Sequence, residues 1–255
     1  MIFCFGTVCW GGYLERYVNI FVDNYITIYR KLISLGINHA DIVEPKIVCC
    51  GDVAGDNVEK AINTLLIATG KQLNIIYDKR KWSTEKIMYS TRNRLRSEFK
   101  KAYPNEQKVY FYFPIDDKVR PEIVSEFIKL SKATEPSACM FKFYVNQGGN
   151  DFTATTRPIR SYKDIHPKDW GGYCAYTILD EEKCPLYPTI AIPNIAFYAE
   201  LYRAGYKQYE SEKICIEHLR HGDSHHFKFK DAKMSQDVTK FLLKQRADLC
   251  EKGYK

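Results

Sequence analysis

Two adjacent aspartates, Asp116 and Asp117, follow a run of mostly apolar residues that spans positions 108–115. Their carboxylates repel each other unless a cation or a proton neutralises part of the charge. Mg²⁺ and Mn²⁺ are hard cations that bind one or two carboxylates together with the phosphate oxygens of a substrate. Aspartate is also common in turns and at helix N-termini. The pair therefore predicts either a divalent-metal site or a polar turn.

Polar residues also follow three apolar runs closer to the N-terminus. They are Thr7 after the first run, Asp52 after the second, and Asp78, Lys79 and Arg80 after the third. The carboxyl ends of parallel strands meet at one edge of a sheet, and ligands bind in the crevice outside that edge. We therefore expect these residues and Asp116 to line one site.

The elements that must position these residues alternate between short apolar runs and segments with helical spacing. Short apolar runs bounded by turn residues indicate buried strands, and apolar residues three and four apart indicate helices. This alternation predicts an α/β fold with a mostly parallel central sheet flanked by helices. We expect strands at 2–8, 46–50, 73–77, 108–115, 138–145, 171–179 and 213–219, and helices at 14–35, 57–69, 83–101, 121–132, 192–204 and 234–250.

The composition is that of a globular chain, since 45% of its 255 residues are hydrophobic and 27% are charged. The formal net charge of +7 favours an anionic ligand, such as a nucleoside diphosphate, a nucleic acid or an acidic glycan. A solvated basic surface without a ligand is the alternative. We interpret the chain as one domain.

The nine cysteines include no Cys-x-x-Cys pair, which argues against a zinc ribbon and a disulfide framework. A reducing, cytoplasmic setting is therefore expected. The N-terminus lacks the basic and apolar regions of a signal peptide, so none is expected. No apolar run is long enough to predict a membrane span.

Three segments together resemble the GT-A glycosyltransferases, especially their large family-2-like group. The segments are CCGDVAGDN (49–57), STRNRLRSEF (90–99) and YFYFPIDDKVRPEIV (110–124). The resemblance implies a single GT-A-like, Rossmann-related domain. It also implies that Asp52 contacts the nucleotide base, that Arg92 and Asn93 lie near the nucleotide, and that Asp116 and Asp117 hold Mn²⁺ or Mg²⁺.

Members of this family often have a histidine after the last strand, where it completes the metal site. The segment KICIEHLRHGDSHH (213–226) contains His218, His221, His225 and His226. The resemblance favours His218 as a metal ligand, because it lies at the end of the expected strand, and His221 is second. A flexible basic loop near phosphate is the alternative interpretation.

The chain departs from the family pattern at two places. Pro114 stands where the first aspartate of an Asp-x-Asp signature would be, which leaves Asp116 as the conventional ligand. Pro193 and Asn194 stand where inverting members have an acidic pair that supplies the general base. Either the reaction retains configuration or another carboxylate is the base. The candidates are Asp180, which we rank first, and then Glu181, Glu182 and Asp169.

The resemblance implies transfer of a sugar from a nucleoside-diphosphate sugar to a hydroxyl of a glycan, a protein or, as a minor alternative, modified DNA. Residues 1–132 would bind the nucleotide sugar, residues 133–233 would form the acceptor side, and residues 234–255 would be a C-terminal helix. A binding module for nucleotides or nucleic acids is one alternative function. A nucleotidyltransferase is another, although Gly11-Gly12 lacks the adjacent basic residue of that class apart from Arg16.

Overall fold

The computed structural model describes residues 1–51, 55–79, 85–113, 115–145, 152–155, 158–161, 164, 173–188 and 193–218. Several predicted features lie outside these residues, and they stay predictions. They are the site residues Asp52 and Arg80, the base candidate Asp169, the histidines His221, His225 and His226, and the C-terminal helix.

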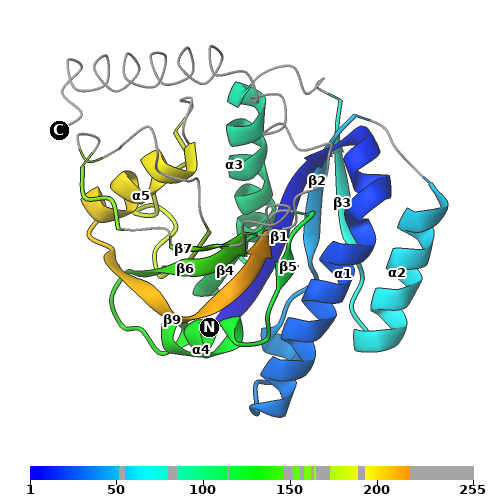
Figure 1. Ribbon diagram of the computed structural model, residues 1–255, viewed down its shortest axis with the longest axis horizontal. Coiled ribbons are helices and arrows are strands. Elements are labelled where there is room, and N and C mark those ends of the chain that lie inside the picture. The colour runs from blue at the N-terminus through cyan, green and yellow to red at the C-terminus, as the bar shows by residue number, and fades with distance from the viewer. Residues whose placement is uncertain are drawn as a thin grey trace.

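The described strands form one nine-stranded sheet with the order β3-β2-β1-β4-β8-β6-β9-β5, with β7 paired to β6 (Figure 1). Strands β1 to β4, β6 and β9 run in one direction, while β5, β7 and β8 run in the other. The bounds are β1 (Ile2–Trp10), β2 (Lys46–Cys50), β3 (Asn74–Asp78), β4 (Lys108–Tyr112), β5 (Lys118–Val119), β6 (Ser137–Val145), β7 (Phe152–Thr155), β8 (Cys174–Ile178) and β9 (Lys207–His218). The predicted α/β class with a mostly parallel sheet is confirmed.

Helices cover both faces of this sheet. Helices α1, α2 and α4 pack with one core cluster, and α3 and α5 pack with the other. Their bounds are α1 (Gly11–Ser34), α2 (Asp56–Thr69), α3 (Glu85–Ala102), α4 (Ile123–Ser131) and α5 (Pro193–Arg203), and a short 3₁₀ helix spans His39–Asp41. Among the described helices, none is both long and apolar enough to cross a bilayer.

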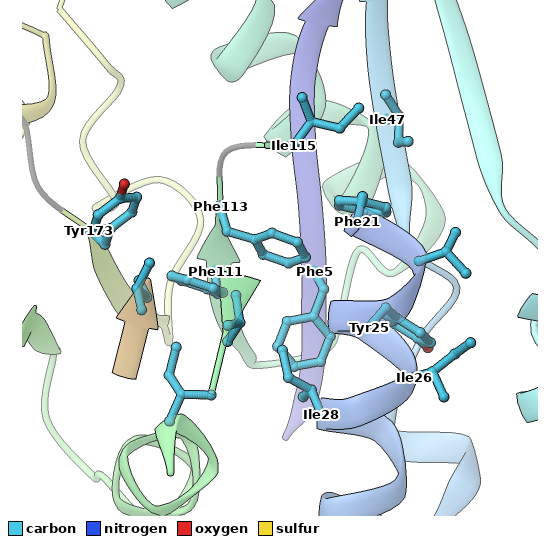
Figure 2. Close-up of a cluster of buried hydrophobic side chains, with 14 of the residues drawn as sticks. Phe5, Phe21, Tyr25, Ile26, Ile28, Ile47, Phe111, Phe113, Ile115 and Tyr173 are labelled. Atoms are coloured by element: carbon cyan, nitrogen blue, oxygen red, sulfur yellow. The ribbon is translucent and has the colours of Figure 1, made fainter. Parts of the chain in front are cut away.

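The central strands are apolar on both sides because both sides are covered. In β1, Phe3 and Phe5 point into the core beneath α1, while Ile2 and Cys4 point into the core beneath α3. Figure 2 shows the first core, in which Phe5 and Phe111 of the sheet pack against the helix side chains. This double burial explains why these strands read as continuous apolar runs rather than as alternating ones.

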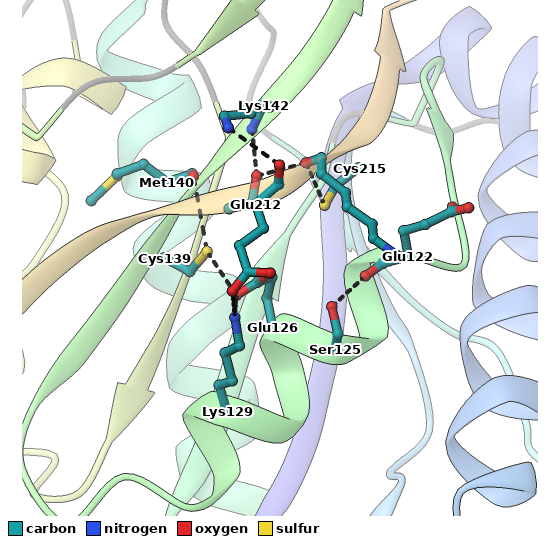
Figure 3. A network of polar contacts seen from close by, with 11 residues as sticks. Glu122, Ser125, Glu126, Lys129, Cys139, Met140, Lys142, Glu212 and Cys215 are labelled. Atoms are coloured by element: carbon teal, nitrogen blue, oxygen red, sulfur yellow. Dashed lines mark hydrogen bonds and ion pairs between the residues drawn. The ribbon is translucent and has the colours of Figure 1, made fainter.

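A network of polar side chains fixes α4 against β6 and β9 (Figure 3). The Glu126 carboxylate is buried, and the Lys129 ammonium lies 3.4 Å from it and 2.7 Å from Glu212. Burial, together with the nearby Glu126 charge, raises the pKa of Cys139, so its thiol stays protonated beside the Glu126 carboxylate. A buried carboxylate is thereby paired rather than left as an isolated charge.

The N-terminus of α2 is capped by a side chain from α1. Glu15 Oε1 accepts a hydrogen bond of 2.9 Å from the backbone N–H of Asn57, and the carboxylate lies against Gly55. A Cβ atom at position 55 would overlap that carboxylate. The Gly55 backbone is extended and unstrained, so a larger residue there would need only the flexible Glu15 side chain to move away from its capping position.

Replacing Glu15 with alanine is expected to lower the free energy of unfolding by about 1 kcal/mol, the usual value of one helix cap. Urea unfolding measures this change. The exposed Lys60 on the same helix supplies the control, because Lys60→Ala should change stability by less than about 0.5 kcal/mol. Equal effects of the two substitutions would contradict the capping role of Glu15.

Candidate functional site

The strands that run in the common direction bring their carboxyl ends to one edge of the sheet. We call this edge, marked by Trp10, Cys50, Asp78, Tyr112 and His218, the carboxyl edge. Strand β8 runs the other way, so Tyr173, which directly precedes it, lies at the same edge. The sheet therefore brings the segment after β4, the end of β9 and the start of β8 together.

Asp117 lies at the centre of a buried hydrogen-bond network at the carboxyl edge. Its side chain is fully buried, and its Oδ1 lies 2.9 Å from His218 Nδ1. The Tyr173 hydroxyl donates to Asp117 Oδ2 and lies 3.2 Å from the same histidine nitrogen. Both carboxylate oxygens are thus engaged by protein groups. An ionised carboxylate has about four acceptor sites, so these two contacts leave the assignment of Asp117 as a metal ligand a prediction.

Asn24 of α1 holds the backbone on both sides of this network. Its amide nitrogen donates to the Asp117 carbonyl over 2.6 Å, and its amide oxygen accepts from the Val119 N–H over 2.9 Å. Neither Asn24 nor Tyr173 was predicted from the sequence. A signal for Asn24 was present, because it is a polar residue within the buried stripe of α1.

Asp116 is partly exposed beside this network. Burial, with a smaller contribution from the Asp116 carboxylate, raises the pKa of Tyr13 to about 12. Burial and the negative charge of Asp117 raise the pKa of Tyr173 well above its ordinary value, so its hydroxyl stays protonated and can donate. Among the two adjacent aspartates, Asp116 is the one whose side chain reaches towards solvent.

Aromatic rings line the junction between β1 and α1 at the carboxyl edge. The ring centroids of Trp10 and Tyr13 are 3.8 Å apart, and those of Tyr13 and Tyr17 are 4.9 Å apart. The Arg16 guanidinium lies 6.0 Å from the Tyr17 ring centroid. Such faces stack on planar ligand groups as well as on one another.

The predicted ligand residues of α3 lie in the layer between α3 and the segment 184–188. Arg92 is buried, with its guanidinium carbon 4.1 Å from the Tyr112 ring centroid and 5.5 Å from that of Tyr187. Asn93 donates to the Tyr187 carbonyl over 2.9 Å and accepts from its N–H over 2.8 Å. Asn93 thus anchors the backbone of Tyr187.

Replacing Asn93 with alanine is expected to lower the free energy of unfolding by about 1–3 kcal/mol, because both backbone groups of Tyr187 lose their partner. Urea unfolding measures the change, with the exposed Lys100→Ala on the same helix as control. An unaltered unfolding midpoint in the Asn93 variant would contradict this anchoring role.

Two predicted site residues lie away from the carboxyl edge. Thr7 is fully buried within β1, which continues to Trp10, so its side chain does not reach a ligand at the edge. Asp180 follows β8, whose last residue Ile178 pairs with Lys108 at the start of β4. Asp180 therefore lies at the opposite edge of the sheet, far from the segment that carries Asp116.

The chemistry of Asp180 also argues against its predicted role as general base. The side chain is exposed, and its Oδ2 lies 3.1 Å from the Lys183 ammonium. This contact, with the backbone N–H of Glu182, lowers the pKa of Asp180. A carboxylate with a lowered pKa is a weaker base. We do not retain Asp180 as the base.

The donor set at the carboxyl edge fits a divalent cation only in part. Within the described ranges, no group of three or more His, Cys, Asp and Glu side chains is arranged to hold a metal. Asp116 offers a carboxylate, and the second ring nitrogen of His218, Nε2, is the one not bonded to Asp117. Two protein ligands suffice for a cation whose other ligands are substrate oxygens and water.

Solved structures share this architecture. The chain superposes on residues 1–349 of S. aureus TarS in complex with UDP-GlcNAc with a TM-score of 0.56, at 11% identity, over 95% of this chain and 65% of that one. The mannosyltransferase PcManGT from Pyrobaculum calidifontis, in complex with GDP-Man and Mn²⁺, matches with a TM-score of 0.51 at 11% identity, over 98% and 64% of the two chains.

The chain has a GT-A fold. A further S. aureus TarS structure matches with a TM-score of 0.55 at 11% identity, over 86% of this chain but only 37% of that one. The chain thus spans less than two thirds of the length of these TarS chains. No protein-family model and no curated protein sequence matches it. The GT-A fold predicted from the three sequence segments is therefore confirmed by structure rather than by sequence.

Proposed function

We propose that this chain transfers a sugar from a nucleoside-diphosphate sugar to a hydroxyl acceptor. The observation that supports this most is the position of Asp116 at the carboxyl edge of a GT-A sheet, beside a histidine held by Asp117. Structures with this fold include complexes of UDP-GlcNAc and of GDP-Man with Mn²⁺. The use of a nucleoside-diphosphate sugar as the donor by this chain is part of the proposal.

In this proposal, Asp116 and His218 Nε2 hold Mn²⁺ or Mg²⁺ against the diphosphate of the donor. The bound cation would stabilise negative charge on the leaving nucleoside diphosphate. We assign Asp117 to the positioning of His218 rather than to the cation, because Tyr173 and His218 contact its two oxygens.

The nucleotide would lie across the carboxyl edge. We propose that the ring of Trp10, which packs on Tyr13 at the end of β1, binds its planar base, because ligands of α/β folds bind outside the carboxyl ends of the strands. Arg92 on α3, and Asp52 and Arg80 outside the described residues, are proposed as further nucleotide contacts. The acceptor is proposed to be a glycan or a protein, with modified DNA as the minor alternative.

The full chain, incubated with UDP-GlcNAc or GDP-mannose and Mn²⁺, is expected to release UDP or GDP, with water as the acceptor when no other is supplied. The matched assay supplies nucleoside triphosphate and sugar 1-phosphate. Pyrophosphate release in that assay without nucleoside-diphosphate release in the first would overturn the proposal in favour of a nucleotidyltransferase. Thermal stabilisation by DNA or RNA alone would overturn it in favour of a binding module.

A further inference from the structure

We propose that Tyr173 and Asp117 are positioning residues that hold the His218 imidazole in one tautomer, with its proton on Nδ1 and its lone pair on Nε2. This inference rests on the proposed function, because the lone pair is the group that His218 would offer to the cation beside Asp116. Neither Tyr173 nor Asp117 touches the donor in this proposal. They act through His218.

The tautomer follows from counting the protons in the network. A carboxylate only accepts hydrogen bonds, and the hydroxyl of tyrosine has a single proton to donate. That proton goes to Asp117 Oδ2. The contact of 2.9 Å between Asp117 Oδ1 and His218 Nδ1 therefore needs its proton from the histidine. The Tyr173 oxygen, 3.2 Å from Nδ1, can accept from the same N–H.

The opposite neutral tautomer would place two hydrogen-bond acceptors in direct contact. With a lone pair on Nδ1, His218 and Asp117 Oδ1 would face each other as two acceptors at 2.9 Å. The Tyr173 hydroxyl could relieve only one of them, because its proton is already shared with Asp117. The contact thus selects the Nδ1–H form of the neutral ring.

The network is also fixed in position from three sides. Asn24 holds the backbone of Asp117 from α1, as the two hydrogen bonds described above show. The Tyr173 ring packs edge-on against Phe143 with centroids 5.3 Å apart, and Val145 pairs with His218 in the sheet. The rotation of the imidazole is therefore restrained together with its tautomer.

A histidine restrained in this way is a better ligand than a free one. A carboxylate on the far nitrogen of a ligating histidine fixes the ring and raises its basicity, and loss of such a partner typically lowers metal affinity 10–100-fold. We therefore expect Asp117→Asn to weaken Mn²⁺ binding by about 10–100-fold. Tyr173→Phe, which keeps the carboxylate, should weaken it less.

The first test reads the tautomer directly and needs neither metal nor substrate. The full chain is labelled with ¹⁵N-histidine, and the His218 signals are assigned by their loss in His218→Gln. At a pH where His218 is neutral, wild-type protein should show a protonated Nδ1 and an unprotonated Nε2. Asp117→Asn should populate the second tautomer. A wild-type His218 with its proton on Nε2 would overturn the proposal.

The second test measures binding of Mn²⁺ alone by electron paramagnetic resonance of the free ion. The matched control is Tyr110→Phe, since the buried Tyr110 hydroxyl has no hydrogen-bond partner among the described residues. Weaker binding in Tyr173→Phe than in Tyr110→Phe supports the positioning role, and equal binding in the two contradicts it.

The two tests separate two kinds of failure. Absence of Mn²⁺ binding in wild-type protein that shows the expected tautomer contradicts the metal site of the proposed function, while the positioning of His218 stands. Normal Mn²⁺ binding with no change of tautomer in Asp117→Asn contradicts the positioning role alone. If Asp117→Asn does not fold, the wild-type tautomer and Tyr173→Phe still decide the matter.

Discussion

Replacing Asp116 with alanine is expected to reduce the rate of sugar transfer by about 10²–10³-fold, the usual loss when one group that stabilises charge in the transition state is removed. Asp116 is partly exposed at the carboxyl edge, so its loss should leave the fold intact. Release of UDP or GDP measures the rate, and the thermal unfolding midpoint checks the fold.

Asp180→Ala is the matched control for this substitution. It removes an aspartate of the same size from the opposite edge of the sheet, where the side chain is exposed and paired with Lys183. Its rate should equal that of the wild-type protein. An unchanged rate in Asp116→Ala, or a loss in Asp180→Ala as large as that in Asp116→Ala, would contradict the placement of the site.

The largest effect on stability is expected for Phe111→Ala, which should lower the free energy of unfolding by about 3–5 kcal/mol. Phe111 is fully buried in β4, and its ring centroid lies 5.2 Å from that of Phe113 and 5.4 Å from those of Phe127 and Phe141 (Figure 2). Removing the ring leaves a cavity at the point where the sheet meets α4. Urea unfolding measures the loss.

The control for the core substitution is Ile67→Ala on α2, because the Ile67 side chain is 86% exposed. It should change the free energy of unfolding by less than about 0.5 kcal/mol. A loss below about 1 kcal/mol in Phe111→Ala would show that the core around β4 is not packed as described here.

The first half of the fold was predictable because β1, β2 and β4 are buried on both faces. The expected strand at 46–50 coincides with β2, and the expected helix at 57–69 differs from α2 only by its first residue. The expected strand at 108–115 was too long, because β4 ends at Tyr112 and the chain then turns towards Asp117. Apolar composition alone does not separate a strand from the apolar turn that follows it.

The second half was less predictable because β9 carries many exposed residues and β7 is short. Strand β9 begins at Lys207, whereas the sequence predicted a start at 213. The first half of the strand was not predicted because exposed polar side chains are mixed there with partly buried ones. Strand β7 was missed entirely, and among the described strands its partner is β6. Such strands are defined by their partners in the sheet, which a single sequence does not reveal.

The candidate site shows the same division. The position of Asp116 at the carboxyl edge could be predicted because it follows a buried strand, a property of local sequence. Asp180 was misplaced because an apolar run does not reveal the direction of its strand, and β8 is antiparallel to β4. The roles of Asp117 and Tyr173 depend on the approach of residues that are 56 apart in sequence. No local pattern predicts such a contact.

The central claim is that a nucleoside-diphosphate sugar binds at the carboxyl edge through Asp116. The most direct test is the thermal unfolding midpoint with UDP, GDP, UDP-GlcNAc and GDP-mannose, each with and without Mn²⁺, in wild-type protein and in Asp116→Ala. A ligand at about 100 times its Kd stabilises the native state by about 2.7 kcal/mol. The account predicts a Mn²⁺-dependent rise in the wild-type midpoint with one nucleotide and its sugar, and loss of that rise in Asp116→Ala. No rise with any of them, or an equal rise in both proteins, would contradict it.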